Sequence, residues 1–261
     1  MNRQEDLERI RAALDAARHA VEPFTPGSIA WDDKGGGDPV TAADTAIDRV
    51  LKDILPKAGE GWLSEETVDD LSRVDAYRAW VVDPLDGTRE FVQGIPEWCI
   101  SIGLVEGGQP VAGGVLNPAT GELIIGSLET GVTLNGEPVS VGERPGLAGA
   151  TVLASRSEVK RGEWDSYHDA PFQIRACGSV AYKMAVVAAG LVDATWTLVP
   201  KNEWDVVAGV ALVQAAGGHV CHADGTLRAF NQADPLLPNL LASNAAILSE
   251  FRRDWLPAEV G

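Results

Sequence analysis

The spacing of apolar residues along the chain predicts an alternation of helices and strands. Near the amino terminus, apolar side chains recur at the interval of one helical face, at Leu7, Ile10, Leu14, Ala17 and Val21. This interval predicts an amphipathic helix, and a second helix is expected from about Ala42 to Leu55. Between roughly residues 98 and 155, five or six apolar runs are separated by Gly-Gly, Asn-Pro and Asn-Gly, which predict strands joined by turns.

The later half of the chain alternates in the same way. Helices are expected over 179–189 and 205–216, and extended segments over 194–196 and 240–242, before a last helix. Two glycines, Gly217 and Gly218, would end the second of these helices. The mixture of helices and strands predicts an α+β fold built in layers.

An apolar run that ends in two carboxylates is the most informative stretch. Trp80-Val81-Val82 leads directly into Asp83-Pro84-Leu85-Asp86-Gly87-Thr88. Because Pro84 has no N–H to give to a sheet, we expect the strand to stop at Asp83. The two carboxylates and the carbonyl of Leu85 could then converge on a hard cation such as Mg²⁺. An ordinary Asp-Pro turn, with Asp86 as a helix cap, is the alternative.

Two other segments carry acids at comparable places. Ser64-Glu65-Glu66 follows a short apolar approach, and Asp205 follows Trp204 at the start of the expected helix over 205–216. Taken alone, Asp205 could simply cap that helix. Three such turns in one chain suggest instead that the acids meet at one metal site.

Together these turns resemble the Mg²⁺-dependent, lithium-sensitive phosphatases of the inositol monophosphatase superfamily, from the first helix to about residue 250. The motifs that carry the resemblance are Ser64-Glu65-Glu66, Asp83-Pro84-Leu85-Asp86-Gly87-Thr88, and Trp204-Asp205 followed by Gly209 and Ala216-Gly217-Gly218. The resemblance implies an α-β-α-β-α sandwich that forms one catalytic unit over residues 1–261. Within it, subdomains of about 1–145 and 146–261 would place the acids at their junction.

The resemblance also implies roles for individual residues. The implied metal ligands, for two or three Mg²⁺ ions that Mn²⁺ could replace, are Glu65, Asp83, Asp86, Asp205 and the carbonyl of Leu85. Glu65 would hold the ion that carries the attacking water, and the Thr88 hydroxyl, oriented by Asp44, would accept a hydrogen bond from that water. Backbone N–H groups of Gly87 and Thr88 would hold the phosphate.

The expected substrate depends on where this chain departs from the residue pattern of inositol phosphatases as well as on where it matches a related group. Inositol phosphatases bind inositol hydroxyls with a glutamate several residues before the Trp-Asp pair, whereas this chain has Thr197-Leu198-Val199 there. Glu203 instead directly precedes Trp204. With Leu63-Ser64-Glu65-Glu66 and Gly87-Thr88-Arg89-Glu90-Phe91, this pattern is similar to the bacterial 3′(2′),5′-bisphosphate nucleotidases.

That similarity implies adenosine 3′,5′-bisphosphate as the substrate. Inositol-1-phosphate, fructose-1,6-bisphosphate and histidinol phosphate remain alternatives within the superfamily. A non-catalytic relative that binds a metal or a nucleotide is an alternative of another class.

The expected substrate contacts are Gly178, Ser179, Lys183 and Glu203, in addition to Gly87 and Thr88. Backbone N–H groups at Gly178 and Ser179, with the Lys183 side chain, would bind the distal phosphate. Lys183 could instead be a surface residue, and Arg89 is ambiguous in the same way. Trp98 and Trp196 could stack on adenine or belong to the core.

Composition narrows the class of partner. The chain has 261 residues, of which 45% are hydrophobic, and a net charge of −17. Such acidity argues against nucleic-acid polymers and anionic membranes and is unhelpful for a polyanionic substrate, so cations are expected at the site. We expect a small phosphorylated metabolite as partner, a cytoplasmic location without a membrane span, and the homodimer common among related enzymes.

Two smaller expectations concern a loop and the cysteines. The 32–39 loop contains Gly35-Gly36-Gly37 and Lys34, so it could form a lid whose lysine lies near the substrate, or it could be a solvated loop. Cys99, Cys177 and Cys221 are too scattered for a zinc site or a disulfide framework, and we expect buried, reduced thiols.

Overall fold

The helices of the protein are distributed along the whole chain. The computed structural model describes residues 2–33, 39–197 and 199–256. The helices are α1 (Arg3–Val21), α2 (Ala42–Ile54), α3 (Thr88–Gln93), α4 (Arg156–Lys160), the 3₁₀ turn η1 (Asp165–Tyr167), α5 (Val180–Ala188), α6 (Glu203–Ala215) and α7 (Ala245–Asp254).

A seven-stranded sheet is formed by consecutive strands in sequence order. Its strands are β3 (Gly61–Ser64), β4 (Arg78–Asp86), β5 (Cys99–Glu106), β6 (Gln109–Asn117), β7 (Glu122–Ser127), β8 (Gly131–Leu134) and β9 (Glu137–Val139). β3 runs parallel to β4, and the other neighbours are antiparallel. Short turns suffice for antiparallel neighbours, which explains the glycine-rich connections of this region.

A second sheet has the strand order β11-β10-β12-β16-β14. Its strands are β10 (Thr151–Ser155), β11 (Gln173–Cys177), β12 (Ala194–Thr197), β14 (His219–Cys221) and β16 (Leu240–Ser243). Two small pairs complete the described strands: β1 (Trp31–Asp33) with β2 (Pro39–Thr41), and β13 (Lys201–Asn202) with β15 (Leu236–Leu237).

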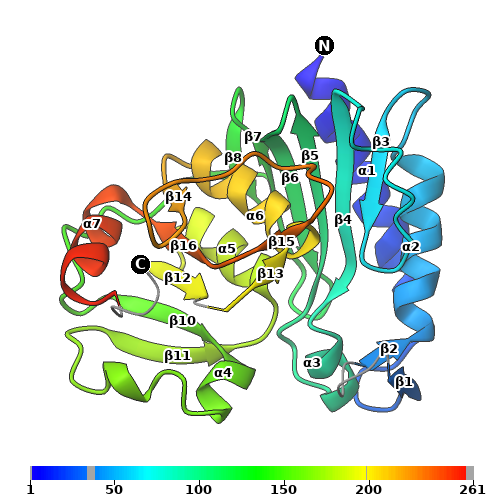
Figure 1. Cartoon of the computed structure of the whole chain (residues 1–261). Helices are drawn as coiled ribbons and strands as arrows, with labels where there is room; N and C mark the ends of the chain where they lie inside the picture. Colours follow the sequence, from blue (N-terminus) through cyan, green and yellow to red (C-terminus); the bar gives the residue numbers. More distant parts are fainter. Residues whose placement is uncertain (1, 34–38, 198, 257–261) are drawn as a thin grey trace.

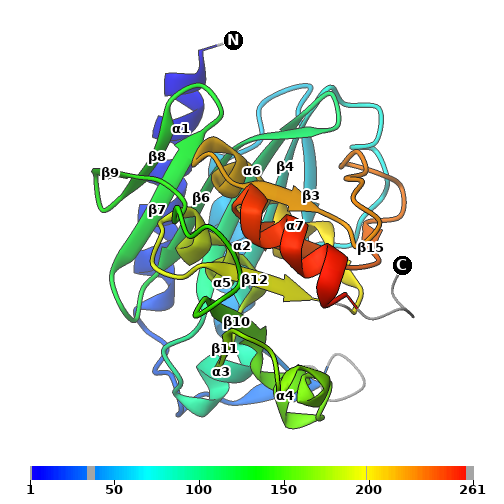
Figure 2. The ribbon, with the colours of Figure 1, turned by 90° about the vertical axis from the view of Figure 1, so that its left-hand side faces the viewer.

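The elements stack in five layers, as the family resemblance implied. α1 and α2 cover one face of the seven-stranded sheet, and α5 and α6 lie between the two sheets (Figure 1). α7 covers the outer face of the second sheet and lies nearest the viewer in Figure 2. Three apolar clusters fill the spaces between these layers, so each sheet is buried on both faces.

One expected boundary was wrong, because β4 does not stop at Asp83. The strand continues through Pro84 to Asp86, and its register with β5 shifts between Asp83 and Asp86. β3 ends at Ser64, opposite Val82, so at Pro84 the strand has only β5 as a neighbour. Pro84 cannot donate a backbone hydrogen bond, and it is accommodated by a bulge at a point where the strand has a neighbour on one side only.

The helix that carries Asp205 packs unusually close to the seven-stranded sheet. An added Cβ at Gly113 of β6 would lie 2.7 Å from the backbone oxygen of Ala208 in α6. Only glycine allows this approach, because backbone atoms on both sides cannot move independently of their elements. The contact with the sheet therefore fixes the distance between α6 and β6, and with it the position of Asp205.

We expect Gly113→Ala to destabilise the protein by about 1–3 kcal/mol, the usual effect of overpacking a dense interior. Urea unfolding should show a lower midpoint with an unchanged slope. Gly142→Ala is the matched control, because an added Cβ there meets nothing nearer than 3.7 Å. Equal stability of the two variants would show that α6 and β6 can move apart enough to accept the added methyl group at little cost in stability.

Several smaller expectations have different outcomes. Lys34 and most of the expected lid fall outside the described residues. The three cysteines form no disulfide, but Cys221 is half-buried rather than buried. No helix among the described residues is long and apolar enough to cross a membrane.

Candidate active site

A cleft of about 350 Å³ opens where the ends of β3 and β4 meet α6 and α4. Its walls come from two separate stretches of the chain, residues 65–90 and 155–205. The acidic side chains that line it include Glu65, Asp83, Asp86 and Asp205. Positive side chains line it as well, namely Arg89, Arg156, Arg161 and Lys201.

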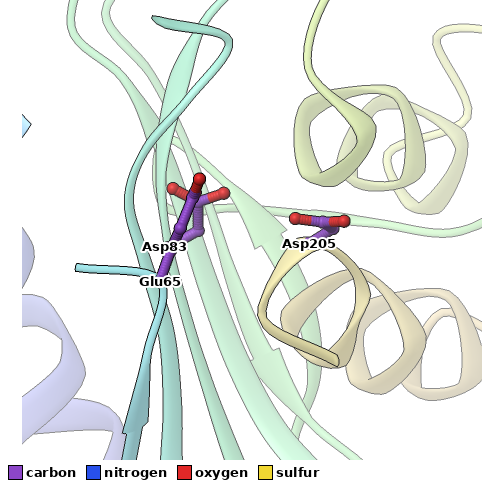
Figure 3. Close-up of side chains that lie close together, drawn as sticks. All are labelled: Glu65, Asp83 and Asp205. Carbon is purple, nitrogen blue, oxygen red and sulfur yellow. The ribbon is translucent and has the colours of Figure 1, made fainter. Parts of the chain in front are cut away.

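Three of these acids form a tight group. One carboxylate oxygen each from Glu65, Asp83 and Asp205 lies within 4.8 Å of the others. Glu65 follows β3, Asp83 lies in β4, and Asp205 projects from the first turn of α6 across from them (Figure 3). The structure thus brings together acids from three turns that are up to 140 residues apart in sequence.

Each aspartate of the cleft is held through one of its oxygens. Asp83 Oδ1 accepts the N–H of Leu85 at 3.0 Å, and Asp205 Oδ2 accepts the N–H of Asn202 at 2.9 Å. Asp86 Oδ2 accepts two hydrogen bonds, from the Ser179 hydroxyl and the Ala181 N–H. Among the described residues, the second oxygen of each makes no hydrogen bond, which leaves it for a ligand in the cleft.

The contact with Asn202 also explains how α6 begins. The helix starts at Glu203, two residues earlier than the sequence pattern indicated, with Asn202 as its N-cap. Asp205 occupies the third helical position, and its carboxylate accepts the backbone N–H of the cap residue Asn202. Asp205 is therefore both a capping residue and a member of the acidic group, so the two interpretations of this residue do not exclude each other.

Thr88 and Asp44, which lie 44 positions apart, are in direct contact. The Thr88 hydroxyl lies 3.0 Å from Asp44 Oδ1 and 3.0 Å from the Leu85 carbonyl oxygen. Asp44 is buried and is fixed through its other oxygen by the backbone and hydroxyl of Thr41. The capping box at the start of α2 thereby fixes the Asp44 carboxylate beside Thr88, which lines the cleft.

The electrostatics of the acidic group are unfavourable without a cation. Burial raises the pKa of Asp83 well above its ordinary value, and repulsion from Glu65, Asp86 and Asp205 raises it further. The pKa of Asp205 is raised well above its ordinary value for the same reasons, with burial again the largest cause. Burial also raises the pKa of Asp86, although hydrogen bonds from Ser179 and Ala181 oppose the effect.

These observations fit a divalent metal rather than a purely structural role. A structural carboxylate in a protein interior is normally matched by a cation or by several hydrogen bonds. Here several acids lie together, each aspartate with one oxygen unused by the described residues. Hard oxygen donors in this number are the ligands that Mg²⁺ and Mn²⁺ prefer.

Two expected substrate contacts lie away from the cleft. Glu203 is fully buried, and its carboxylate accepts the N–H groups of Asn231 and Gln232. Lys183 is also buried, and its ammonium group donates to the Cys177 carbonyl at 3.5 Å. Neither residue lines the cleft, so the structure does not bring either of them to the expected substrate site.

The turn at Gly178 and Ser179 lines the cleft, but two of its polar groups already have partners. The Gly178 N–H donates to Glu97 Oε2 at 2.8 Å, and the Ser179 hydroxyl donates to Asp86 at 2.7 Å. The N–H of Gly178 is therefore not free to seat a phosphate oxygen, contrary to our expectation.

The two tryptophans considered for adenine stacking belong to the core. Trp98 is 2% exposed and Trp196 is 1% exposed. Trp98 packs edge-on against Phe91, while Trp196 stacks on Phe251 within the aromatic cluster beneath α7. The aromatic side chain that does line the cleft is Trp204.

Sequence reasoning missed several residues of the site. Asp48 of α2 accepts hydrogen bonds from the Ser64 and Thr67 hydroxyls and so orders the turn that carries Glu65. Arg156, Arg161 and Lys201 also line the cleft. Asp48 could have been found four positions after Asp44 on the same expected helix face, but no local pattern marked the three cations.

The site combines acids at the ends of two strands and at the start of one helix with a hydroxyl that contacts a buried carboxylate. This arrangement is suited to metal-dependent hydrolysis of phosphate monoesters. The family model described as "Inositol monophosphatase family" matches residues 4–255. The chain therefore belongs to the inositol monophosphatase family and is a metal-dependent phosphoric monoester hydrolase.

Individual relatives agree with this assignment. An inositol-1-monophosphatase of Rhizobium meliloti is 35% identical over 201 residues, covering 74% of this chain and 75% of the relative. A fructose-1,6-bisphosphatase/inositol-1-monophosphatase of Thermotoga maritima is 32% identical, covering 83% of this chain and 82% of the relative. The structure of an inositol monophosphatase from Anabaena superposes with a TM-score of 0.79 at 29% identity, covering 97% and 96%.

Proposed function

We propose that the protein hydrolyses small phosphate monoesters with Mg²⁺ held by Glu65, Asp83, Asp86, Asp205 and the Leu85 carbonyl. The observation that carries this proposal is the convergence of Glu65, Asp83 and Asp205 within 4.8 Å, next to the Thr88–Asp44 pair. Two or three ions are expected, and Mn²⁺ should replace Mg²⁺. When bound, the ions would neutralise phosphoryl charge and lower the pKa of water.

The chain's own residues then have separate tasks. Asp44 orients the Thr88 hydroxyl, whose oxygen can accept a hydrogen bond from the attacking water. Gly87 has φ +100°, and an added Cβ would lie 2.9 Å from the Glu97 carbonyl oxygen. Only glycine fits there, which leaves the N–H groups of Gly87 and Thr88 at the cleft to hold phosphate oxygens.

For the substrate, we propose a phosphorylated polyol or sugar, with inositol-1-phosphate as the first candidate. Support comes from the relatives, whose names are those of inositol phosphatases, and from the loss of the expected nucleotide contacts. Glu203 and Lys183 lie outside the cleft, and Trp98 and Trp196 are buried. These four residues therefore give no support to a bisphosphate nucleotidase.

One observation favours a second candidate, a substrate that carries another anionic group. Arg161 and Lys201 line the same cleft. The Lys201 ammonium group is 3.7 Å from its nearest acid, Glu158, which already accepts hydrogen bonds from Trp164 and Thr197. A second phosphate, as in fructose-1,6-bisphosphate or adenosine 3′,5′-bisphosphate, would find a positive wall there.

A substrate panel tests these candidates. With Mg²⁺ present, inositol-1-phosphate should be hydrolysed with a kcat/KM at least about tenfold above adenosine 3′,5′-bisphosphate, equivalent to roughly 1.4 kcal/mol of discrimination. Phosphate release should be measured for both, for fructose-1,6-bisphosphate and for histidinol phosphate. Higher efficiency on either bisphosphate would favour the second candidate, and no release from any of them would overturn the proposed chemistry.

The oligomeric state and the location of the protein remain predictions. Related enzymes led us to expect a homodimer, and we propose the same here. Light scattering of the purified protein would show whether its mass is twice that of one chain.

A further inference from the structure

The turn that precedes α5 reaches across the cleft to Asp86. The Ser179 hydroxyl lies 2.7 Å from Asp86 Oδ2, and the Ala181 N–H donates to the same oxygen at 2.6 Å. Asp86 ends β4 in the seven-stranded sheet, whereas Ser179 follows β11 of the second sheet. The carboxylate is thus held by the segment that joins β11 of the second sheet to α5 and by the first turn of that helix.

The hydroxyl of Ser179 contacts three groups of the protein. It donates to Asp86, accepts the N–H of Tyr182 at 3.0 Å and lies 3.3 Å from the Cys99 thiol. The residue is 7% exposed. Since a hydroxyl has one proton and two lone pairs, little of this hydroxyl remains to bind a substrate.

The backbone at Ser179 supports the same conclusion. Its φ is +53° and its ψ is 120°, a region in which residues other than glycine are rare. Strained conformations persist where the surrounding structure determines them, and they concentrate at functional sites. Here the preceding residue is fixed by the hydrogen bond from the Gly178 N–H to Glu97, which also accepts one from Arg156.

We propose that Ser179 is a positioning residue for Asp86, and that it fixes the orientation of this carboxylate for metal binding. The inference rests on the proposed function, because it takes Asp86 as a metal ligand. With Oδ2 held by two donors, Oδ1 is the oxygen that Asp86 presents to the ion. This role belongs to the side-chain hydroxyl of Ser179, whereas the expected phosphate contact involved its backbone N–H.

Ser179→Ala should weaken metal binding by about tenfold, within the usual effect of removing a group that orients a ligand. The readout is a calorimetric titration of Mn²⁺ into the substrate-free protein, so activity is not needed. The metal concentration for half-maximal phosphatase activity should rise by the same factor. Should the alanine variant not fold, Ser179→Gly removes the hydroxyl while adopting the positive φ without strain.

A matched control separates this role from helix capping. Ser179 also caps α5, and a lost cap alone lowers stability by about 1 kcal/mol. Asn244→Ala removes the corresponding cap of α7, where the side chain accepts the N–H of Ile247 at 2.9 Å. It also removes the hydrogen bonds that this side chain donates to the carbonyls of Gly142 and Arg144. This control should melt at a lower temperature than the unaltered protein but bind Mn²⁺ equally well.

The outcomes distinguish the two proposals. If the unaltered protein binds Mn²⁺ and hydrolyses phosphate esters while Ser179→Ala binds within twofold of it, the positioning role alone is overturned. The same holds if Asn244→Ala loses as much affinity as Ser179→Ala. If the unaltered protein neither binds Mn²⁺ nor releases phosphate, the proposed function fails as well.

Discussion

Asp83→Asn should lower kcat/KM by about a hundredfold or more, equivalent to at least roughly 2.7 kcal/mol of transition-state stabilisation. The substitution keeps the size of the side chain and the acceptor that receives the Leu85 N–H. It removes the charge, which is the property a divalent ion requires of this position. Steady-state phosphate release over a series of Mg²⁺ concentrations gives the measurement.

The same variant should not unfold more readily in the absence of metal. Asp83 is 2% exposed and lies among acids that repel it, so neutralising it relieves an unfavourable interaction. We therefore expect a melting temperature equal to or above that of the metal-free unaltered protein. A large fall in melting temperature, or near-normal turnover, would contradict the metal-ligand assignment.

Asp224→Asn is the control for charge alone. Asp224 lies in an exposed turn, where its Oδ1 accepts the N–H and the hydroxyl of Thr226. The substitution removes one negative charge from the chain without touching the cleft. Its kcat/KM should stay within about twofold of the unaltered protein, because exposed charges at a distance are screened by solvent and salt.

The acidic group could be predicted because each of its members is marked locally. Asp83 follows an apolar run, Glu65 follows a shorter one, and Asp205 stands at a helix start. Strand ends and helix starts gather at the same edges of a layered fold, so residues in these places tend to meet. The order of the layers came from the resemblance, since periodicity gives elements but not their packing.

The substrate contacts could not be predicted because distant partners decide them. Glu203 is turned away from the cleft by N–H groups at Asn231 and Gln232, almost thirty residues later. Lys183 lies on the face of α5 that packs into the core. The Gly178 N–H is taken by Glu97, 81 positions earlier. No local sequence pattern around Glu203, Lys183 or Gly178 indicates these distant partners.

The last prediction concerns Thr88, whose hydroxyl has two acceptors within 3.0 Å but only one proton. The proton points to Asp44 or to the Leu85 carbonyl, and in either case the lone pairs of the oxygen remain free to accept from water. Asp44 is immobilised through its other oxygen by Thr41. This arrangement is that of a relay that orients and activates water, rather than of a group that only binds substrate.

Thr88→Ala should therefore lower kcat by roughly a hundredfold while changing KM by no more than about threefold. Thr88→Ser keeps the hydroxyl and should retain most of the activity. Asp44→Asn should fall between the two, because it loses the charge and keeps one acceptor oxygen where the carboxylate has two. All three are compared at saturating Mg²⁺, so that metal affinity does not enter the result. If Thr88→Ala raises KM and leaves kcat unchanged, the hydroxyl holds the phosphate and takes no part in activating water.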